Sequence, residues 1–174
     1  RDTHRCLAQA VLQGLLDYDA HMGQGWSDEQ ANTFLTVPEW LAELEHAVGR
    51  GYGAHAPDTH AEVFRAMGYH LGSEVLADQE FSLIDAELRA AQPDLIAYMT
   101  NHAVEIAGQA HNAYTWISIH SGHGGGVEAD HFDWAVRGVH RALRYSDPAD
   151  RAGLREHVLR GFDDPRREAR FHTD

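Results

Sequence analysis

Several residue types are scarce or missing in this chain, and each absence excludes a class of chemistry. The 174 residues contain one cysteine, and all 14 basic residues are arginine. Without lysine the chain can form neither a Schiff base with a carbonyl cofactor nor the lysine contact of a phosphate-binding loop. The single cysteine, Cys6, excludes an internal disulfide, an all-cysteine zinc site and a self-contained iron–sulfur cluster.

Positively charged residues are few, and long apolar segments are absent from the sequence. The 14 arginines stand against 27 acidic residues, which gives a formal charge of -13 with neutral histidines. We therefore expect no nucleic-acid partner and no anionic membrane surface, because both require a basic protein surface. No apolar run approaches the roughly 20 residues of a membrane span, and the first residues lack the apolar core of a signal peptide. These features favour a soluble cytoplasmic protein.

Histidine, by contrast, is abundant, with 14 copies in a chain that is 43% hydrophobic. The length and the apolar content suit one globular domain with a substantial core, and we expect residues 1–174 to form it. Histidine and carboxylate side chains are therefore the groups from which any catalytic chemistry would have to be built.

Helical spacing of apolar residues runs through the chain. Leu7, Val11, Leu15 and Tyr18 share one stripe of an amphipathic helix, and no segment shows a convincing alternation of period two. The spacing, together with proline, glycine and capping residues, predicts further helices at 38–49, from 58 or 59 past 67, and at 73–91, 93–117, 127–145 and 148–159. The sequence thus predicts an all-α protein, a single bundle of about seven or eight helices.

The strongest local pattern is a glutamate followed three residues later by a histidine, at Glu128 and His131. On a helix these two side chains lie about one turn apart on the same face. In helix bundles, such a Glu-x-x-His pair is the recurring contribution of one helix to a di-iron carboxylate site. An isolated pair of this kind is more often an exposed glutamate and a surface histidine.

Repetition of the pattern favours the metal interpretation. Glu43 and His46 form a second Glu-x-x-His pair, and Glu105 lies inside a segment that is otherwise apolar. Carboxylates and imidazoles within a core are costly unless they are paired or bound to a metal. The candidate metal ligands are Glu45, His60, Glu105, His120, Glu128 and His131, with His55 as the alternative to His60 and His123 as the alternative to His120.

The rise of a helix limits which of these residues can share a metal. Within one continuous helix, Glu105 and His120 would lie about 22 Å apart. If the chain turns at the glycine run 122–126, His120 faces His131 across two antiparallel helices. If it turns earlier, near His111, Glu105 can face His120 instead. Spacing alone leaves both arrangements open.

Two segments resemble the heme-oxygenase-like diiron oxidases and oxygenases. The first runs from Glu45 through a glycine-rich loop to His60 and into an apolar helix. The second leads from the aromatic and histidine-containing stretch 116–120 to Glu128 and His131. Together with the closing helix, these segments extend the resemblance over about two-thirds of the chain.

The resemblance implies a heme-oxygenase-like helical domain that binds two ferrous ions per chain and activates dioxygen. It implies a small amino-acid-like or fatty-acid-like substrate that undergoes N-oxygenation, desaturation or C–C cleavage, in the biosynthesis of a natural product. An external electron donor and a homodimer are compatible with this expectation. We expect Arg65 or Arg137 to bind a substrate carboxylate bidentately.

Other functions stay open on the same evidence. A metal-free enzyme similar to thiaminase II or pyrroloquinoline-quinone synthase would use its histidines as acids and bases, although Cys6 is poorly placed as a nucleophile. A heme oxygenase would use a single proximal histidine, which leaves the inward carboxylates without a role. A non-catalytic helical binding protein would carry its histidines as polar surface.

Overall fold

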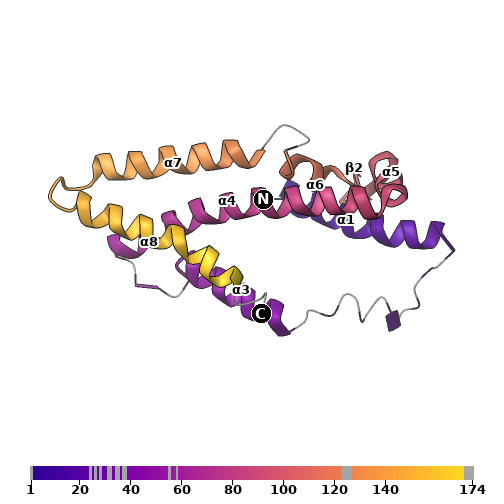
Figure 1. Ribbon diagram of the computed structural model, residues 1–174, viewed down its shortest axis with the longest axis horizontal. Helices are drawn as coiled ribbons and strands as arrows, with labels where there is room; N and C mark the ends of the chain where they lie inside the picture. Colours follow the sequence, from indigo (N-terminus) through magenta and orange to yellow (C-terminus); the bar gives the residue numbers. More distant parts are fainter. Residues whose placement is uncertain are drawn as a thin grey trace. The chain divides into compact units, whose positions relative to one another are not determined.

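A computed structural model describes the chain except at positions 1, 24, 26, 28, 31, 32, 34, 35, 37, 38, 55, 58, 123–126 and 171–174. At positions 2, 3, 40, 127–129 and 168–170 the backbone alone is described. The described residues are mostly helical, as the sequence predicts, and Figure 1 shows the elements along the chain. These elements are α1 (Asp2–His21), α3 (Glu39–Gly51), α4 (His60–Ala91), α5 (Pro93–Asn101), β1 (Ala103–Ile106), β2 (Gln109–Asn112), α6 (Thr115–His120), α7 (Val127–Tyr145) and α8 (Arg151–Arg170).

Contacts group the chain into two compact units. Unit 1 comprises Arg1–Thr36 and Gln79–Val127, and unit 2 comprises Val37–Asp78 and Glu128–Asp174. Helix α4 therefore begins in unit 2 and ends in unit 1, and each unit has a hydrophobic core of its own. The organisation as one domain stays a prediction. Among the described helices, none has the length and the apolar character needed to cross a membrane.

Unit 1 packs α1 against α5, α6 and a small β-hairpin. The side chains at the centre of this packing are buried and almost all apolar, so burial of their surface is the main stabilising contribution. They are Ala10, Leu95, Ile96, Met99, Val104, Ala113, Tyr114 and Ile117.

The prediction of one long helix over residues 93–117 is wrong, because a β-hairpin interrupts this segment. Strands β1 and β2 are antiparallel, and Val104 pairs with His111. Ala107 and Gly108 connect them with positive φ angles of 53° and 77°. Two successive residues of positive φ make the tight turn that matches the twist of a hairpin, and glycine adopts this conformation without strain. The chain therefore reverses its direction before residue 109.

Unit 2 packs the first part of α4 against α7 and α8, with α3 alongside α8 (Figure 1). Its buried core residues come from these three helices: Phe64, Leu71, Val139, Leu143, Leu154 and Val158. The expected helix at 127–145 is confirmed by α7. The two helices expected between 58 and 91 form one helix, α4, and α8 continues through Pro165 instead of ending at 159.

Helices α4 and α8 approach each other closely because glycines lie where they cross. A Cβ atom on Gly161 would overlap the carbonyl oxygen of Arg65 and lie 2.9 Å from the backbone nitrogen of Tyr69. A Cβ atom on Gly68 would likewise overlap the carbonyl oxygen of Val158. The missing side chains thus allow the two backbones to touch, which a larger residue at either position would prevent.

Candidate functional site

A carboxylate lies between two imidazole rings in unit 2. Nδ1 of His70 is 3.3 Å from Oε1 of Glu74, and Nδ1 of His131 is 3.4 Å from Oε2 of the same residue. The side chain of Glu74 is 13% exposed, against 44% for His70 and 25% for His131. We call these three residues the His–Glu–His cluster. A nearly buried carboxylate therefore contacts histidines from two different helices, one with each oxygen.

The helices place this cluster at the edge of the core of unit 2. His70 and Glu74 are four residues apart on α4, which puts them on one face of the helix. Leu71, next to His70, belongs to the buried core, and so does Val139 on α7. Burial of this apolar surface holds α7 beside α4, and His131 reaches Glu74 as a result.

Tyr52 and Ser73 fix the proton of His70. The Tyr52 hydroxyl lies 2.8 Å from Oγ of Ser73 and 3.2 Å from Nδ1 of His70. Ser73 donates its only proton to the carbonyl oxygen of His70, at 2.8 Å. Tyr52 therefore donates to Ser73, and its oxygen and Oε1 of Glu74 both face Nδ1 of His70 as acceptors. With two acceptors facing this nitrogen, Nδ1 of His70 carries a proton.

Tyr52 keeps its phenolic proton at neutral pH. Burial raises the pKa of Tyr52, and the negative charge of Glu74 acts in the same direction, whereas the hydrogen bond with Ser73 opposes them. The net effect is a pKa above the ordinary value of a tyrosine. The hydroxyl is therefore available at neutral pH as a neutral hydrogen-bonding group.

A cavity of about 520 Å³ lies beside Tyr52 and His70. Pockets for small organic molecules in proteins typically have volumes of roughly 300–1,000 Å³. The other described residues that line this cavity are Gly53, Ala56, Pro57, Glu62, Val63, Ala66 and Met67. An apolar small molecule of moderate size therefore fits beside the His–Glu–His cluster.

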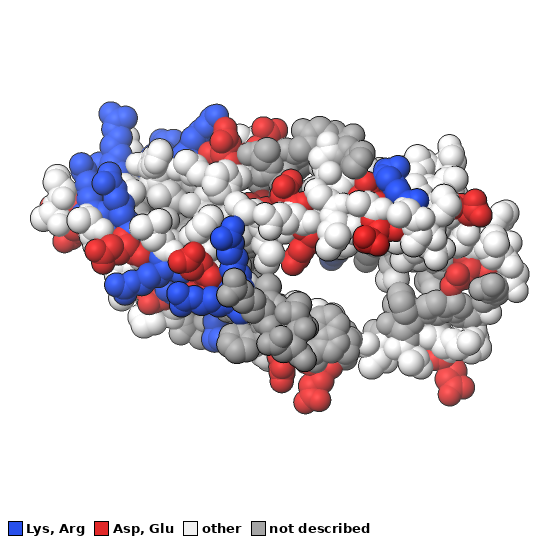
Figure 2. Space-filling view, viewed as in Figure 1, with Lys and Arg blue, Asp and Glu red and all other residues white. Residues whose placement is uncertain are grey.

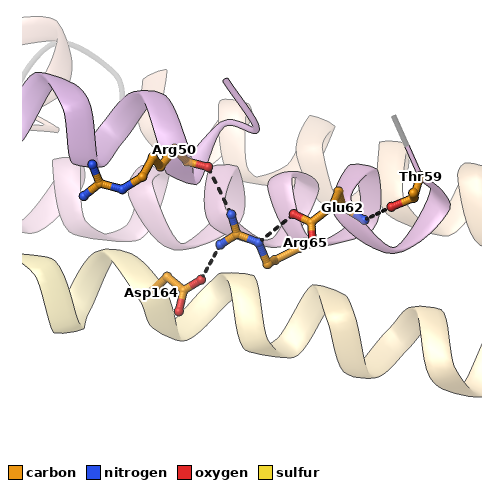
Figure 3. A network of polar contacts seen from close by, with 5 residues as sticks. All are labelled: Arg50, Thr59, Glu62, Arg65 and Asp164. Carbon is orange, nitrogen blue, oxygen red and sulfur yellow. Dashed lines mark hydrogen bonds and ion pairs between the residues drawn. The ribbon is translucent and has the colours of Figure 1, made fainter. Parts of the chain in front are cut away.

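Arg65, expected to bind a substrate carboxylate, binds three oxygen atoms of the protein (Figure 3). Its Nε donates to Glu62 at 3.2 Å, Nη1 to Asp164 at 2.7 Å and Nη2 to the carbonyl oxygen of Arg50 at 3.0 Å. Burial alone would lower the pKa of Arg65, but its two carboxylate partners raise it on balance. This network ties the end of α3 and the middle of α8 to α4, so its first role is structural.

Arg137, the other candidate for substrate binding, lies on the surface of α7. Its side chain is 74% exposed and contacts Asp133, one turn earlier, at 3.3 Å. Figure 2 shows that arginine side chains gather over α7 and α8, with acidic side chains between them. Neither Arg65 nor Arg137 is among the described residues that line the cavity beside Tyr52.

The structure places the predicted metal ligands in different surroundings. In unit 2, Glu45 and His60 are exposed, whereas His131 contacts Glu74. In unit 1, Glu105 is exposed on β1. His120 is 3% exposed, and its Nδ1 lies 2.6 Å from the carbonyl oxygen of Trp116. The alternatives His55 and His123 and the side chain of Glu128 lie outside the described residues.

The chemistry of the His–Glu–His cluster suits iron, although its present geometry does not form a closed metal site. In the part of the chain that the structure describes, no three His, Cys, Asp or Glu side chains are arranged so that they could hold a metal ion. Two imidazoles and one carboxylate are nevertheless the ligand types of open non-heme iron sites. Binding of an ion would therefore require rotation of these side chains, for which the partial exposure of both histidines leaves room.

His70 and Glu74 are the residues of the cluster that the sequence argument missed. The predicted motif is a glutamate followed by a histidine three residues later, whereas this pair has the opposite order and a spacing of four. The available signal was two polar side chains, one turn apart, beside the apolar residues Met67 and Leu71. That signal alone does not show that His131 completes the group.

Unit 1 contains a second contact between a carboxylate and a histidine. Nε2 of His102 lies 2.7 Å from Asp17, and Nε2 of Gln13 donates to the same carboxylate at 2.8 Å. Burial alone would raise the pKa of Asp17, but the hydrogen bonds from Gln13 and His102 lower it below its usual value of 3.8. The ring of Tyr98 stacks on His102, with 4.8 Å between the ring centroids. The contact thus joins α1 to the end of α5.

A buried polar group also links α4 to α6 within unit 1. Asp85 is fully buried and accepts a hydrogen bond from the Tyr114 hydroxyl at 2.6 Å. Arg89, one turn later on α4, donates to the other oxygen at 2.8 Å. Burial and the adjacent carboxylate raise the pKa of Tyr114, which keeps its proton on the hydroxyl. These contacts stabilise the packing of unit 1 and point into no cavity described above.

No known protein family, curated protein sequence or solved structure matches this chain. The resemblance to diiron oxidases therefore rests on the residues quoted from the sequence. In unit 2, the His–Glu–His cluster and the cavity adjoin at His70.

Proposed function

We propose that unit 2 binds iron at the His–Glu–His cluster and uses it to oxidise a small molecule with dioxygen. One observation carries the proposal: Glu74 contacts Nδ1 of His70 at 3.3 Å and Nδ1 of His131 at 3.4 Å. Two imidazoles and one carboxylate leave several positions of a ferrous ion open, as binding of dioxygen requires. The adjoining cavity provides space for a substrate.

The surroundings of the histidines support a role as ligands. A metal-bound histidine usually has its other ring nitrogen fixed by a hydrogen bond, which sets the tautomer. The Tyr52 hydroxyl, 3.2 Å from Nδ1 of His70, is a partner of this kind for one ring nitrogen. On α7, the sequence adds Glu128, one helical turn before His131, as a further carboxylate.

When bound, ferrous iron would supply the electrons that begin the reduction of dioxygen. In an N-oxygenation, one oxygen atom enters the substrate, and the other leaves as water with two protons and two electrons from an external donor. The residues that line the cavity would bind the substrate. The Tyr52 hydroxyl and Nδ1 of His70 would hold protons at the wall of this cavity.

Two further expectations remain proposals on the same basis. A heme-oxygenase-like arrangement and a second iron follow from the resemblance alone. A role in biosynthesis, a homodimer and an external electron donor belong to the same proposal. The stoichiometry of iron binding separates a single ion at the His–Glu–His cluster from the pair that the resemblance implies.

The test is an anaerobic titration of the full chain with ferrous iron, followed by rapid mixing with oxygenated buffer under optical detection. Saturable binding of one or two ions, with a transient visible absorption after mixing, supports the proposal. Glu74→Gln keeps the size of the side chain and removes its charge, so we expect at least about tenfold weaker iron binding. Glu156→Gln, on the exposed surface of α8, is the matched control. Absence of iron binding would overturn the proposal and favour metal-free acid–base chemistry.

A further inference from the structure

The cavity beside the His–Glu–His cluster has an apolar wall and one polar end. Its apolar wall is formed by Ala56, Pro57, Val63, Ala66 and Met67, and its polar end by Tyr52 and His70. A wall of this composition favours a guest with an apolar body, because binding removes the apolar surfaces of both the guest and the wall from water. The polar end then decides which functional group that guest can carry.

Charge at the cavity disfavours a carboxylate. Glu62 is the acidic side chain among the described lining residues, and Glu74 adds a second negative charge beside His70. No arginine is among those described lining residues, so an anion would lose its hydration without gaining a cationic partner. A cationic guest would find both carboxylates already in contact with protein groups, Glu62 with Arg65 and Glu74 with two histidines. An uncharged guest meets neither difficulty.

The positions of the protons at the polar end of the cavity require a guest that donates a hydrogen bond. Tyr52 gives its proton to Ser73, and its oxygen faces Nδ1 of His70 at 3.2 Å. A hydroxyl oxygen can accept two hydrogen bonds, so one lone pair of Tyr52 remains for a guest. A guest with an N–H or O–H group can use it, whereas an ether or an ester cannot.

We propose that this cavity takes an uncharged, largely apolar molecule with one N–H or O–H group, which donates to the hydroxyl oxygen of Tyr52. That this molecule is the substrate to be oxidised rests on the proposed function; that the cavity binds such a molecule does not. The sequence predicts a carboxylate-bearing substrate, whereas the cavity suits an uncharged arylamine-like, indole-like or alcohol-like one.

Four naphthalene probes test the charge and the donor separately at neutral pH, by equilibrium dialysis against the full chain. They are 2-naphthol, its methyl ether, 2-naphthoate and protonated 2-naphthylmethylamine. We expect 2-naphthol to bind at least about tenfold more tightly than either charged probe, since each would carry a poorly compensated charge into the cavity. The methyl ether should bind several-fold more weakly than 2-naphthol. Equal or tighter binding of a charged probe, or no binding of 2-naphthol, would overturn the proposal.

Two substitutions locate the binding. Tyr52→Phe should lower the affinity for 2-naphthol to that for the methyl ether and leave the methyl ether unchanged, because it removes only the hydroxyl. Ala66→Leu should weaken binding of 2-naphthol at least about tenfold by filling the cavity, whereas Ala86→Leu, on an exposed position of the same helix, should not. Circular dichroism checks that each variant is folded. Retention of 2-naphthol binding by Ala66→Leu would place the probe elsewhere and refute the assignment.

Measurement of iron binding on the same samples separates the two proposals. If 2-naphthol binds as described and iron does not bind, the cavity assignment stands and the oxidation proposal fails. If iron binds and 2-naphthol does not, the proposed function stands and the assignment of the cavity is wrong.

Discussion

Replacement of Gly161 by alanine tests the close crossing of α4 and α8. The added Cβ would overlap the carbonyl oxygen of Arg65 and lie 2.9 Å from the backbone nitrogen of Tyr69. Both of these are backbone atoms, so no side chain can rotate to make room and the helices must move apart. Overpacking of this kind costs up to about 3 kcal/mol, and the higher helix propensity of alanine returns about 1 kcal/mol. We expect a net loss of about 2 kcal/mol in the free energy of unfolding.

Gly153 provides the matched control, because it lies on the same helix and nothing stands within 4 Å of an added Cβ. The same substitution there adds helix propensity without a clash. We expect Gly153→Ala to raise the free energy of unfolding by about 0.5 kcal/mol. The two variants therefore differ in the sign of their effect, although the chemical change is identical.

The assay is urea unfolding of wild type and both variants, followed by far-ultraviolet circular dichroism. A loss of about 2 kcal/mol lowers the urea midpoint at an unchanged slope of the unfolding free energy against urea concentration. If Gly161→Ala is as stable as wild type, or gains stability like Gly153→Ala, the backbones of α4 and α8 do not meet at this glycine. The packing described for unit 2 would then be incorrect.

Two further predictions concern charged side chains. Arg65→Gln should lower the free energy of unfolding by about 2 kcal/mol, because it removes contacts with two carboxylates. Arg137→Gln, on the exposed surface, should change it by less than about 0.5 kcal/mol. Urea unfolding measures both values, and equal effects would argue against the network in Figure 3. The lowered pKa of Asp17 stabilises the fold above the unfolded value of 3.8, and this contribution is lost as the pH falls through the folded pKa. The stability difference between wild type and Asp17→Asn should therefore shrink as the pH is lowered from 5 to 3, and a difference that stays constant would contradict it.

Helices with clear local signals could be predicted from the sequence, and those shaped by packing could not. The helix 127–145 is bounded by a glycine run before it and by Ser146 and Pro148 after it, and α7 has those bounds. The sequence predicts two helices between residues 58 and 91, but in the structure Gly68 and Gly72 lie inside the single helix α4, where both allow a close approach of α8. Packing between distant segments thus outweighs the low helix propensity of glycine.

The same distinction applies to the hairpin. Val104 and Ile106 continue an apolar pattern that suits a helix as well as a short strand, and Ala-Gly is a weaker turn signal than Asn-Gly or Asp-Gly. The positive φ of Ala107 is a conformation that the sequence does not favour at an alanine. Glu105 therefore lies on β1 and not within a helix.

The candidate site was only partly predictable. The Glu-x-x-His pattern selected His131, and that histidine contacts a carboxylate in unit 2. Its partner Glu74 could not be identified from spacing, because their contact depends on how α7 packs against α4 rather than on separation along the chain. For Arg65, the sequence indicated a charged group available to a substrate, whereas three protein oxygens surround its guanidinium.

The most direct test of the central claim is the affinity for ferrous iron of two histidine variants of α7, measured without oxygen. His131→Ala removes a histidine of the His–Glu–His cluster, whereas His140→Ala removes an exposed histidine of the same helix. The account predicts at least about tenfold weaker binding for His131→Ala and unchanged binding for His140→Ala. Equal affinities in the two variants, or no binding by wild type, would show that the His–Glu–His cluster is not an iron site.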